Sequence, residues 1–225
     1  PRIVTVGRGE HADWRLDDRS LPAVLYCPDG SRFRLCLSVS GGHNRMNAAM
    51  VFVTCWLLGI DPARALEGLA SFSGVGRRFE LRGKTAGVRV FDDYAHHPTE
   101  IRATIAAARE EFPHGRIRVV FQPHTYSRTR ELLAEFASAL DTADEATLVE
   151  IYPARETDDL GVSSQSIAEL MQSNPEVLPT PVAAAARLAA SVREGDVVLF
   201  LGAGDIWKAA PDLLNRLQAE TENHG

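Results

Sequence analysis

The stretch VRVFDDYAHHPTE, residues 88–100, passes from a short apolar run into a polar segment that opens a helix. Val88 to Phe91 predicts a strand, and Thr99 to Glu111 predicts a helix whose entry is fixed by Pro98, with Thr99 or His97 near its cap. The alternation continues to the end of the chain. Further strands are expected at 117–121, 146–151, near 178 and at 197–201, and further helices at 128–140, 164–172, 181–192 and 205–217.

Short, continuously apolar strands that alternate with helices are typical of a mostly parallel sheet covered by helices on both faces. The fold class expected for this part of the chain is therefore α/β and Rossmann-like. Sheets of this kind bind ligands at the carboxyl ends of their strands. The loops that follow the strands are the places where a site is expected.

The first part of the chain has a different pattern. Strands are expected at 3–6, 23–26 and 33–38, the last two as a hairpin around residues 28–31. A helix should run from the loop at 40–44 to Leu58, and a second from Asp61-Pro62 to about Ala70. The glycine- and serine-rich residues 71–76 predict a boundary between domains at 1–73 and 74–225. Because the first residues of the chain already have the pattern of a strand and no methionine precedes them, we expect the chain to be part of a longer protein.

Composition excludes several classes. Hydrophobic residues make up 45 % and charged residues 24 %, which is ordinary for a globular protein. The net charge of −6 argues against a general nucleic-acid partner. The longest apolar run, Ala48 to Ile60, is too short to cross a membrane, and no export signal opens the chain. Three cysteines without metal-type spacing suggest free thiols in the cytoplasm.

Two clusters of polar residues precede the α/β part. In Gly41 to Ala49, the Asn47 amide could donate to and accept from an adenine edge near a helix start; the alternative is plain N-terminal capping by Asn44. In Gly76 to Glu80, Arg77 and Arg78 could hold a nucleotide phosphate beside a hinge. A solvated surface pair is the alternative there.

Two more clusters follow strands. In Phe91 to Glu100 we expect Asp93 to grip a ribose diol and His96 to face the substrate. A metal site on His96 and His97 is disfavoured, because adjacent residues rarely chelate one ion, so no metal site is expected. In Phe121 to Thr129, Arg128 lies in a first helical turn, where a cation is unfavourable. That position suggests an anionic ligand, although a nearby glutamate could serve instead.

Two glycine motifs are weaker. Gly83-Lys84-Thr85 resembles the end of a P-loop, but the earlier glycine would fall at Arg78, so we expect the tip of a β-turn. Gly202-Ala203-Gly204 lacks the third glycine of a dinucleotide fingerprint and predicts a tight strand-to-helix turn with some ligand potential.

In this order, the segments resemble those of the Mur ligase family, over nearly the whole chain. The matching segments are Gly41–Ala48 for the pattern G-x-H-N-x-x-N-A, Gly74–Glu80 for the linker G-x-x-R-R-F-E, Asp92–Glu100, Gln122–Thr129, Ile151–Glu156 and Gly202–Ile206. The resemblance implies a three-domain enzyme of which this chain holds the end of the central ATPase domain and all of the third domain. Asp92–Glu100 and Gln122–Thr129 look like the alanine-adding branch of the family.

That branch implies a reaction. L-alanine is joined to the lactyl carboxylate of UDP-N-acetylmuramate through an acyl phosphate formed with ATP and Mg²⁺, in peptidoglycan synthesis. The P-loop and most Mg²⁺ ligands are expected upstream of Pro1, so the chain alone is expected not to ligate.

The resemblance also implies roles for residues. His43 and Asn47 would contact adenine, and Arg78 and Asp93 would reach ATP. Tyr94, His96 and Arg128 would line the amino-acid site, with His96 and Arg128 as catalytic residues and Arg128 on the alanine carboxylate. Thr125 stands where some relatives carry arginine, which leaves the product contacts in doubt.

Two other functions remain open. A recycling ligase that joins UDP-N-acetylmuramate to a whole tripeptide shares the histidine segment, but should differ over Pro123 to Arg128. A non-catalytic α/β module that binds a nucleotide or a protein partner is the other alternative.

Overall fold

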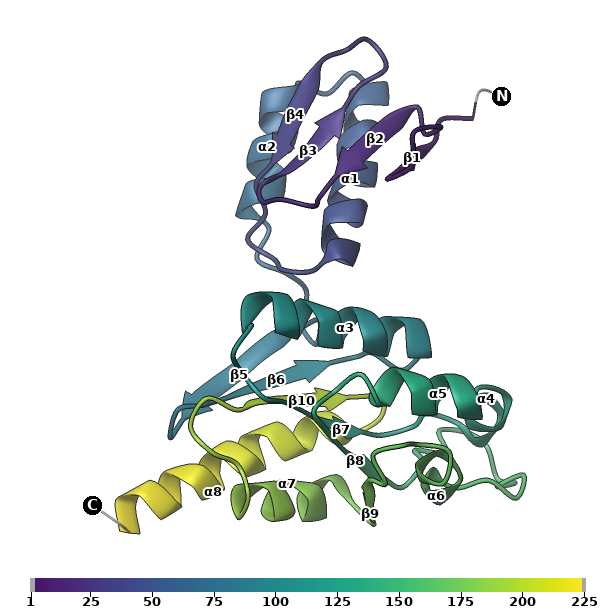
Figure 1. The fold of residues 1–225 in the computed structure, drawn as a ribbon, viewed down its shortest axis with the longest axis vertical. Coiled ribbons are helices and arrows are strands. Elements are labelled where there is room, and N and C mark those ends of the chain that lie inside the picture. Colours follow the sequence, from purple (N-terminus) through teal and green to yellow (C-terminus); the bar gives the residue numbers. More distant parts are fainter. Residues whose placement is uncertain (1–2, 224–225) are drawn as a thin grey trace. The chain divides into compact units, whose positions relative to one another are not determined.

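The computed structural model describes residues 3–223, which form two compact units (Figure 1). The first unit ends at Gly74 and the second begins at Val75, one residue from the boundary expected from the sequence. Each unit has a hydrophobic core of its own.

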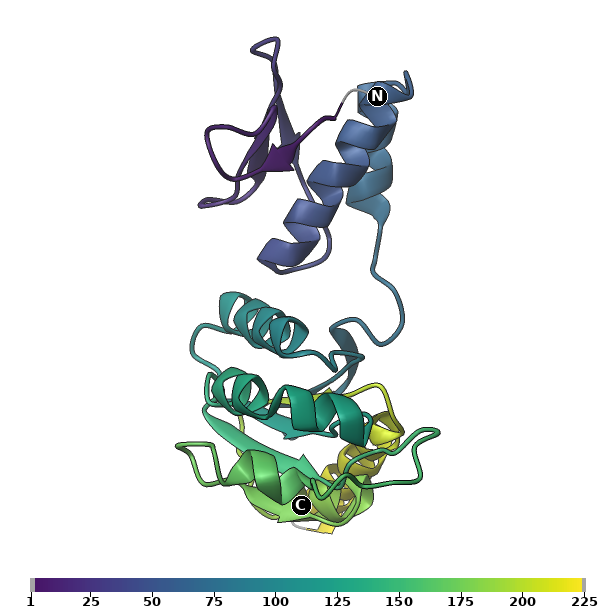
Figure 2. The same cartoon turned by 90° about the vertical axis from the view of Figure 1, so that its right-hand side faces the viewer.

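The first unit is a four-stranded sheet with two helices against one face (Figure 2). Its elements are β1 (Val6–Gly7), β2 (Trp14–Asp17), β3 (Ala23–Tyr26), β4 (Arg32–Leu35), α1 (Gly42–Leu57) and α2 (Pro62–Ser71). The predicted hairpin is confirmed as the antiparallel pair β3–β4. The first strand is shorter than expected, and β2 was not predicted.

The helix starts of this unit follow two different rules. α2 is capped as predicted, because the Asp61 carboxylate accepts a hydrogen bond from Arg64 N (3.0 Å) and Pro62 opens the helix. The alternative of a cap by Asn44 on α1 is wrong. Asn44 lies inside α1 and donates to the Ser40 carbonyl (2.7 Å), while Gly41, at φ 99°, takes the capping position without a side-chain hydrogen bond.

The second unit is a six-stranded sheet in the order β5-β6-β10-β7-β8-β9. Its strands are β5 (Glu80–Thr85), β6 (Val88–Asp93), β7 (Ile117–Phe121), β8 (Glu145–Val149), β9 (Glu176–Leu178) and β10 (Val197–Leu201). Every neighbouring pair is parallel except β5–β6. The predicted fold class, a mostly parallel α/β sheet, is confirmed.

Helices cover both faces of this sheet (Figure 1). They are α3 (Pro98–Glu111), α4 (Tyr126–Glu131), α5 (Leu133–Leu140), α6 (Ser164–Ala168), α7 (Pro181–Ala189), a short 3₁₀ turn at Ile206–Lys208 and α8 (Ala209–Asn223). α3, α5 and α6 pack on one face, and α7 and α8 on the other. β7 and β10 are therefore buried along their whole length, which explains why their residues are apolar, with Arg118 in β7 as the exception.

Two predictions about elements are wrong. Gly83-Lys84-Thr85 lies inside β5, and the turn falls at Ala86-Gly87, which both have positive φ (50° and 75°) as a tight hairpin requires. The single helix expected over 128–140 is two helices, α4 and α5, interrupted at Leu132 (φ −117°, ψ 25°). That break carries no glycine or proline and so gives no sequence signal.

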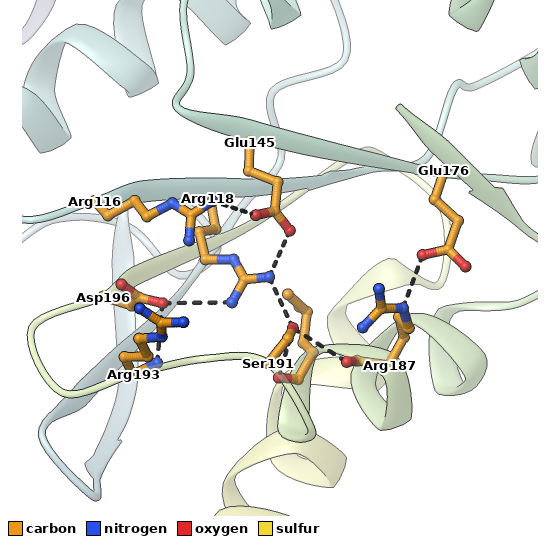
Figure 3. A network of polar contacts seen from close by, with 9 residues as sticks. Arg116, Arg118, Glu145, Glu176, Arg187, Ser191, Arg193 and Asp196 are labelled. Atoms are coloured by element: carbon orange, nitrogen blue, oxygen red, sulfur yellow. Dashed lines mark hydrogen bonds and ion pairs between the residues drawn. The ribbon is translucent and has the colours of Figure 1, made fainter. Parts of the chain in front are cut away.

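Arg118 is a buried charged residue at the amino edge of the sheet (Figure 3). Arg118 in β7 has a side chain only 3 % exposed. It donates to Glu145 (2.5 Å), Ser191 Oγ (2.8 Å) and Asp196 (3.4 Å), which lie in β8, just after α7 and just before β10. The network joins elements that are far apart in the sequence, on the edge opposite the strand-end loops.

Candidate active site

The loops that follow β6, β7, β8 and β10 meet at the carboxyl edge of the parallel sheet. They comprise residues 94–97, 122–125, 150–156 and 202–205. Beyond the strands, His124 and Tyr152 pair in a further parallel bridge, which continues the β7–β8 register into the loops. Two of the four predicted polar clusters and the Gly202–Gly204 turn are thus brought together.

Four aromatic rings form a row along this edge. Ring centroids lie 5.3 Å apart for Tyr94 and His96, 6.2 Å for His96 and His124, and 5.7 Å for His124 and Tyr152. Tyr94 and His96 were predicted site residues. His124 and Tyr152 were noted only as parts of motifs, and their place in the row depends on the pairing of β7 with β8.

Arg128 lies beside this row, in the first turn of α4. Its Nη1 is 3.4 Å from both Nδ1 and the carbonyl oxygen of His124. Burial and the neighbouring Arg128 charge lower the pKa of His124, which keeps that imidazole neutral.

The glutamate considered as an alternative partner for Arg128 is present, but it has another role. Glu156 accepts hydrogen bonds from Tyr126 N (2.5 Å), Ser127 N (3.1 Å) and the Ser127 hydroxyl, and so satisfies the start of α4. The Ser127 hydroxyl is the main cause of the lowered pKa of Glu156. Among the described residues, no carboxylate forms an ion pair with Arg128, whose guanidinium is half-buried.

The two linker arginines differ. Arg77 is held by the Asp92 carboxylate (3.0 Å) and by the Gly202 carbonyl (2.7 Å), with a left-handed backbone (φ 57°). It is therefore not a solvated surface residue. Arg78 is half-exposed; its guanidinium lies 3.7 Å from Glu100 Oε1 and 5.5 Å from the centre of the Tyr94 ring. Of the two linker arginines, Arg78 has the more exposed side chain, 50 % against 25 % for Arg77.

The Asp93 carboxylate is turned inward, with 6 % of the residue exposed. It accepts hydrogen bonds from Phe79 N (2.8 Å), Ala95 N (2.7 Å) and Thr104 Oγ1 (3.2 Å). Burial is the main influence on its pKa, which is raised. The contact with a ribose diol stays a prediction. In the structure, Asp93 ties the linker at Phe79 to the start of the loop that carries Tyr94 and His96.

The adjacent histidines have separate partners. His97 is the N-cap of α3. Its Nδ1 accepts a hydrogen bond from Thr99 N (3.3 Å), and the Glu100 carboxylate accepts a hydrogen bond from His97 N (3.2 Å). His96 Nδ1 lies 2.9 Å from the Tyr94 carbonyl oxygen. Across residues 3–223, no group of three or more histidine, cysteine, aspartate or glutamate side chains could hold a metal ion.

The Gly202–Gly204 turn packs tightly, as expected. A Cβ on Gly204 would collide with Gln122 Oε1 and would lie 2.6 Å from Tyr152 Cγ. Gln122 in turn donates to Asp205 (3.0 Å) and accepts from Ile206 N (3.0 Å). The turn thus fixes the Tyr152 end of the ring row.

His43 and Asn47 belong to the first unit. Both are exposed, and they lie one turn apart on α1, so their side chains share one face of the helix. One ligand could contact both residues.

The second unit thus has the form of a Rossmann-like ligand-binding domain. Its polar site lies at the carboxyl ends of parallel strands, and the linker arginines Arg77 and Arg78 precede its first strand. Residues 77–204 match the family model described as Mur ligase, glutamate ligase domain, and the chain belongs to the Mur ligase family.

Comparison with individual proteins supports the assignment to this family. UDP-N-acetylmuramate–L-alanine ligase of Paenarthrobacter aurescens is 45 % identical over 216 residues, which are 96 % of this chain and 47 % of that protein. The crystal structure of UDP-N-acetylmuramate-alanine ligase from Thermotoga maritima is 32 % identical, with a TM-score of 0.79 over 96 % of this chain and 48 % of that one. A murein peptide ligase from Psychrobacter arcticus shares the fold at 23 % identity, with a TM-score of 0.68 over 95 % of this chain and 46 % of that one. The chain spans about half the length of the curated relatives that it matches.

Among residues 3–223, no helix is both long and apolar enough to cross a bilayer.

Proposed function

We propose that this chain supplies the amino-acid site of an ATP-dependent ligase that joins L-alanine to the lactyl carboxylate of UDP-N-acetylmuramate. The observation that carries the proposal is Arg128, a half-buried cation at the carboxyl edge of the sheet that no described carboxylate neutralises. A planar guanidinium in such a place is suited to grip a carboxylate with two hydrogen bonds. The similarity to alanine-adding ligases supports L-alanine as the owner of that carboxylate.

The other site residues are assigned around Arg128. Tyr94 and His96 form the wall of the amino-acid site. Arg78 reaches the phosphates of ATP. Asp93 acts together with Arg78 in binding ATP, and it fixes the Phe79 backbone next to Arg78. On the first unit, His43 and Asn47 contact the adenine base through their shared face of α1.

The reaction has two steps. Phosphorylation of the lactyl carboxylate by ATP gives an acyl phosphate, and the alanine amine then attacks its carbonyl carbon. Negative charge builds on oxygen atoms in both steps, and an arginine such as Arg78 stabilises such charge best in a site that excludes water. Mg²⁺, held by ATP and by residues other than the site residues named above, would neutralise phosphate charge.

The enzyme proposed here is larger than the chain. In the first unit, α1 and its C-cap residue leave four apolar residues 45–73 % exposed: Met50, Val51, Leu57 and Leu58. Side chains of this kind on one helix are suited to packing against further protein. We therefore expect the 225-residue chain to be inactive alone, and we place the full enzyme in the cytoplasm, where ATP is available and the three free cysteines stay reduced.

The test is phosphate release by the full-length protein with MgATP and UDP-N-acetylmuramate, comparing L-alanine with the stem tripeptide. Release that depends on L-alanine supports the proposal. Release only with the tripeptide would assign the protein to cell-wall recycling instead. No release with either amine would favour a non-catalytic binding module.

A further inference from the structure

The two imidazoles of the ring row are held in opposite tautomers. His96 Nδ1 lies 2.9 Å from the Tyr94 carbonyl oxygen. A carbonyl oxygen only accepts, so His96 Nδ1 must carry the hydrogen. The lone pair of the neutral His96 ring is therefore on Nε2, the atom away from this hydrogen bond.

His124 has the reverse arrangement. Its Nδ1 faces Arg128 Nη1 at 3.4 Å, and a guanidinium only donates, so His124 Nδ1 accepts and Nε2 carries the hydrogen. Burial and Arg128 lower the pKa of His124 further. His124 is consequently a poor proton acceptor, although it is the imidazole nearer to Arg128.

Glu100 contacts both the ring and the backbone of His96. Its Oε2 lies 3.4 Å from His96 Nδ1 and accepts hydrogen bonds from His96 N (3.0 Å) and His97 N (3.2 Å). This carboxylate stabilises a positive charge on the His96 ring. The other charged or titratable groups facing His96 are His124 at 6.2 Å between ring centroids, Tyr94 on its own loop, and Arg78, which pairs with Glu100.

We propose that His96 is the base that takes the proton from the incoming ammonium group, and that Glu100 is the residue that positions it. The inference rests on the proposed function. In an amino acid the amine is two bonds from the carboxyl carbon, so a carboxylate on Arg128 places the ammonium beside the two imidazoles. Of the two imidazoles, His96 is the one whose Nε2 lone pair is free to accept a proton.

The step balances as follows. The ammonium passes one proton to His96 Nε2, and the freed nitrogen lone pair forms the C–N bond to the acyl phosphate. The tetrahedral intermediate collapses with cleavage of the C–O bond, and phosphate leaves with the bonding electron pair. The second N–H proton goes to the departing phosphate, and His96 returns its proton to water.

The test compares two nucleophiles in the full-length protein with MgATP and UDP-N-acetylmuramate. L-alanine arrives as an ammonium and must lose a proton, whereas hydroxylamine is largely unprotonated at neutral pH and traps the acyl phosphate as a hydroxamate. His96→Gln should lower amide formation with L-alanine by roughly 10²- to 10⁴-fold and leave hydroxamate formation near the wild-type rate. Glu100→Gln should give a smaller loss with the same selectivity. His97→Asn, which keeps an acceptor for the cap of α3, is the matched control and should leave both rates unchanged.

The remaining outcomes overturn the assignment. If His96→Gln retains the rate with L-alanine, His96 is not the base. If the variant loses both reactions equally, His96 acts in acyl phosphate formation or in folding. If the wild-type protein gives neither product, the proposed function itself fails, and this inference fails with it.

Discussion

Asp92 is a fully buried carboxylate whose Oδ1 has no hydrogen-bond partner among the described residues, while its Oδ2 is bound to Arg77. Burial is the main cause of its raised pKa. A raised pKa in the folded state means that the carboxyl contributes most to stability below the unfolded value of about 4, and that this contribution is lost as the pH rises through the folded pKa. The ionised Asp92 is thus a cost at neutral pH, tolerated because it holds Arg77.

This gives a pH-dependent prediction. At low pH Asp92 is protonated, so Asp92→Asn replaces one neutral buried group with another. Because only the wild type has to ionise a buried carboxyl as the pH rises, the free energy of unfolding of the wild type minus that of the variant should fall between about pH 4 and about pH 7. Urea unfolding at several pH values measures this difference, and a difference that is constant or grows with pH would contradict the argument.

The sequence indicated some of the site residues but not others, for a physical reason. Tyr94, His96 and Arg128 follow strands directly, and strand ends of one parallel sheet share an edge, so their grouping was predictable. The role of Arg77 was not predictable from the sequence. It depends on a left-handed backbone at φ 57° and on a carbonyl oxygen 125 positions away, neither of which leaves a local signal.

At the scale of elements, burial on both faces decided which strands were predictable. β7 and β10 are continuously apolar apart from Arg118, and their predicted bounds match the structure. β5 is an antiparallel edge strand with mixed exposure, and its polar Gly83-Lys84-Thr85 segment gave no strand signal. α6 ends at Ala168, earlier than expected, and beyond it Gln172 N donates to the Asp141 carboxylate at the end of α5 (3.0 Å).

Arg118 and Arg116 offer a matched pair of substitutions in β7 and the loop just before it (Figure 3). Arg118→Ala leaves the buried Asp196 without its guanidinium partner and should lower the free energy of unfolding by about 3–5 kcal/mol. Arg116→Ala removes only a half-exposed pair with Glu145 and should cost at most about 1 kcal/mol. Equal effects in chemical denaturation would show that the buried network does not stabilise the sheet.

At the scale of the whole molecule, the two units are joined through exposed residues. Phe72 and Val75 are 47 % and 62 % exposed, and each unit has its own core. Brief digestion with chymotrypsin should therefore cut after Phe72 and release the second unit as a stable fragment that unfolds cooperatively. Mass spectrometry identifies the cut. Loss of the second unit at the same rate as the first would contradict independent folding.

Arg128 is proposed above to bind the carboxylate of the incoming amino acid. The most direct measurement is phosphate release by the full-length protein at varied L-alanine concentration, for the wild type, Arg128→Ala and Arg130→Ala. Arg130 is an exposed arginine on the same helix and serves as the control. Loss of charge-assisted hydrogen bonds worth about 1.5–3 kcal/mol should lower kcat/KM for L-alanine by roughly 10- to 150-fold in Arg128→Ala, mainly through KM, while Arg130→Ala stays near the wild type. An unchanged KM for L-alanine in Arg128→Ala would contradict the account.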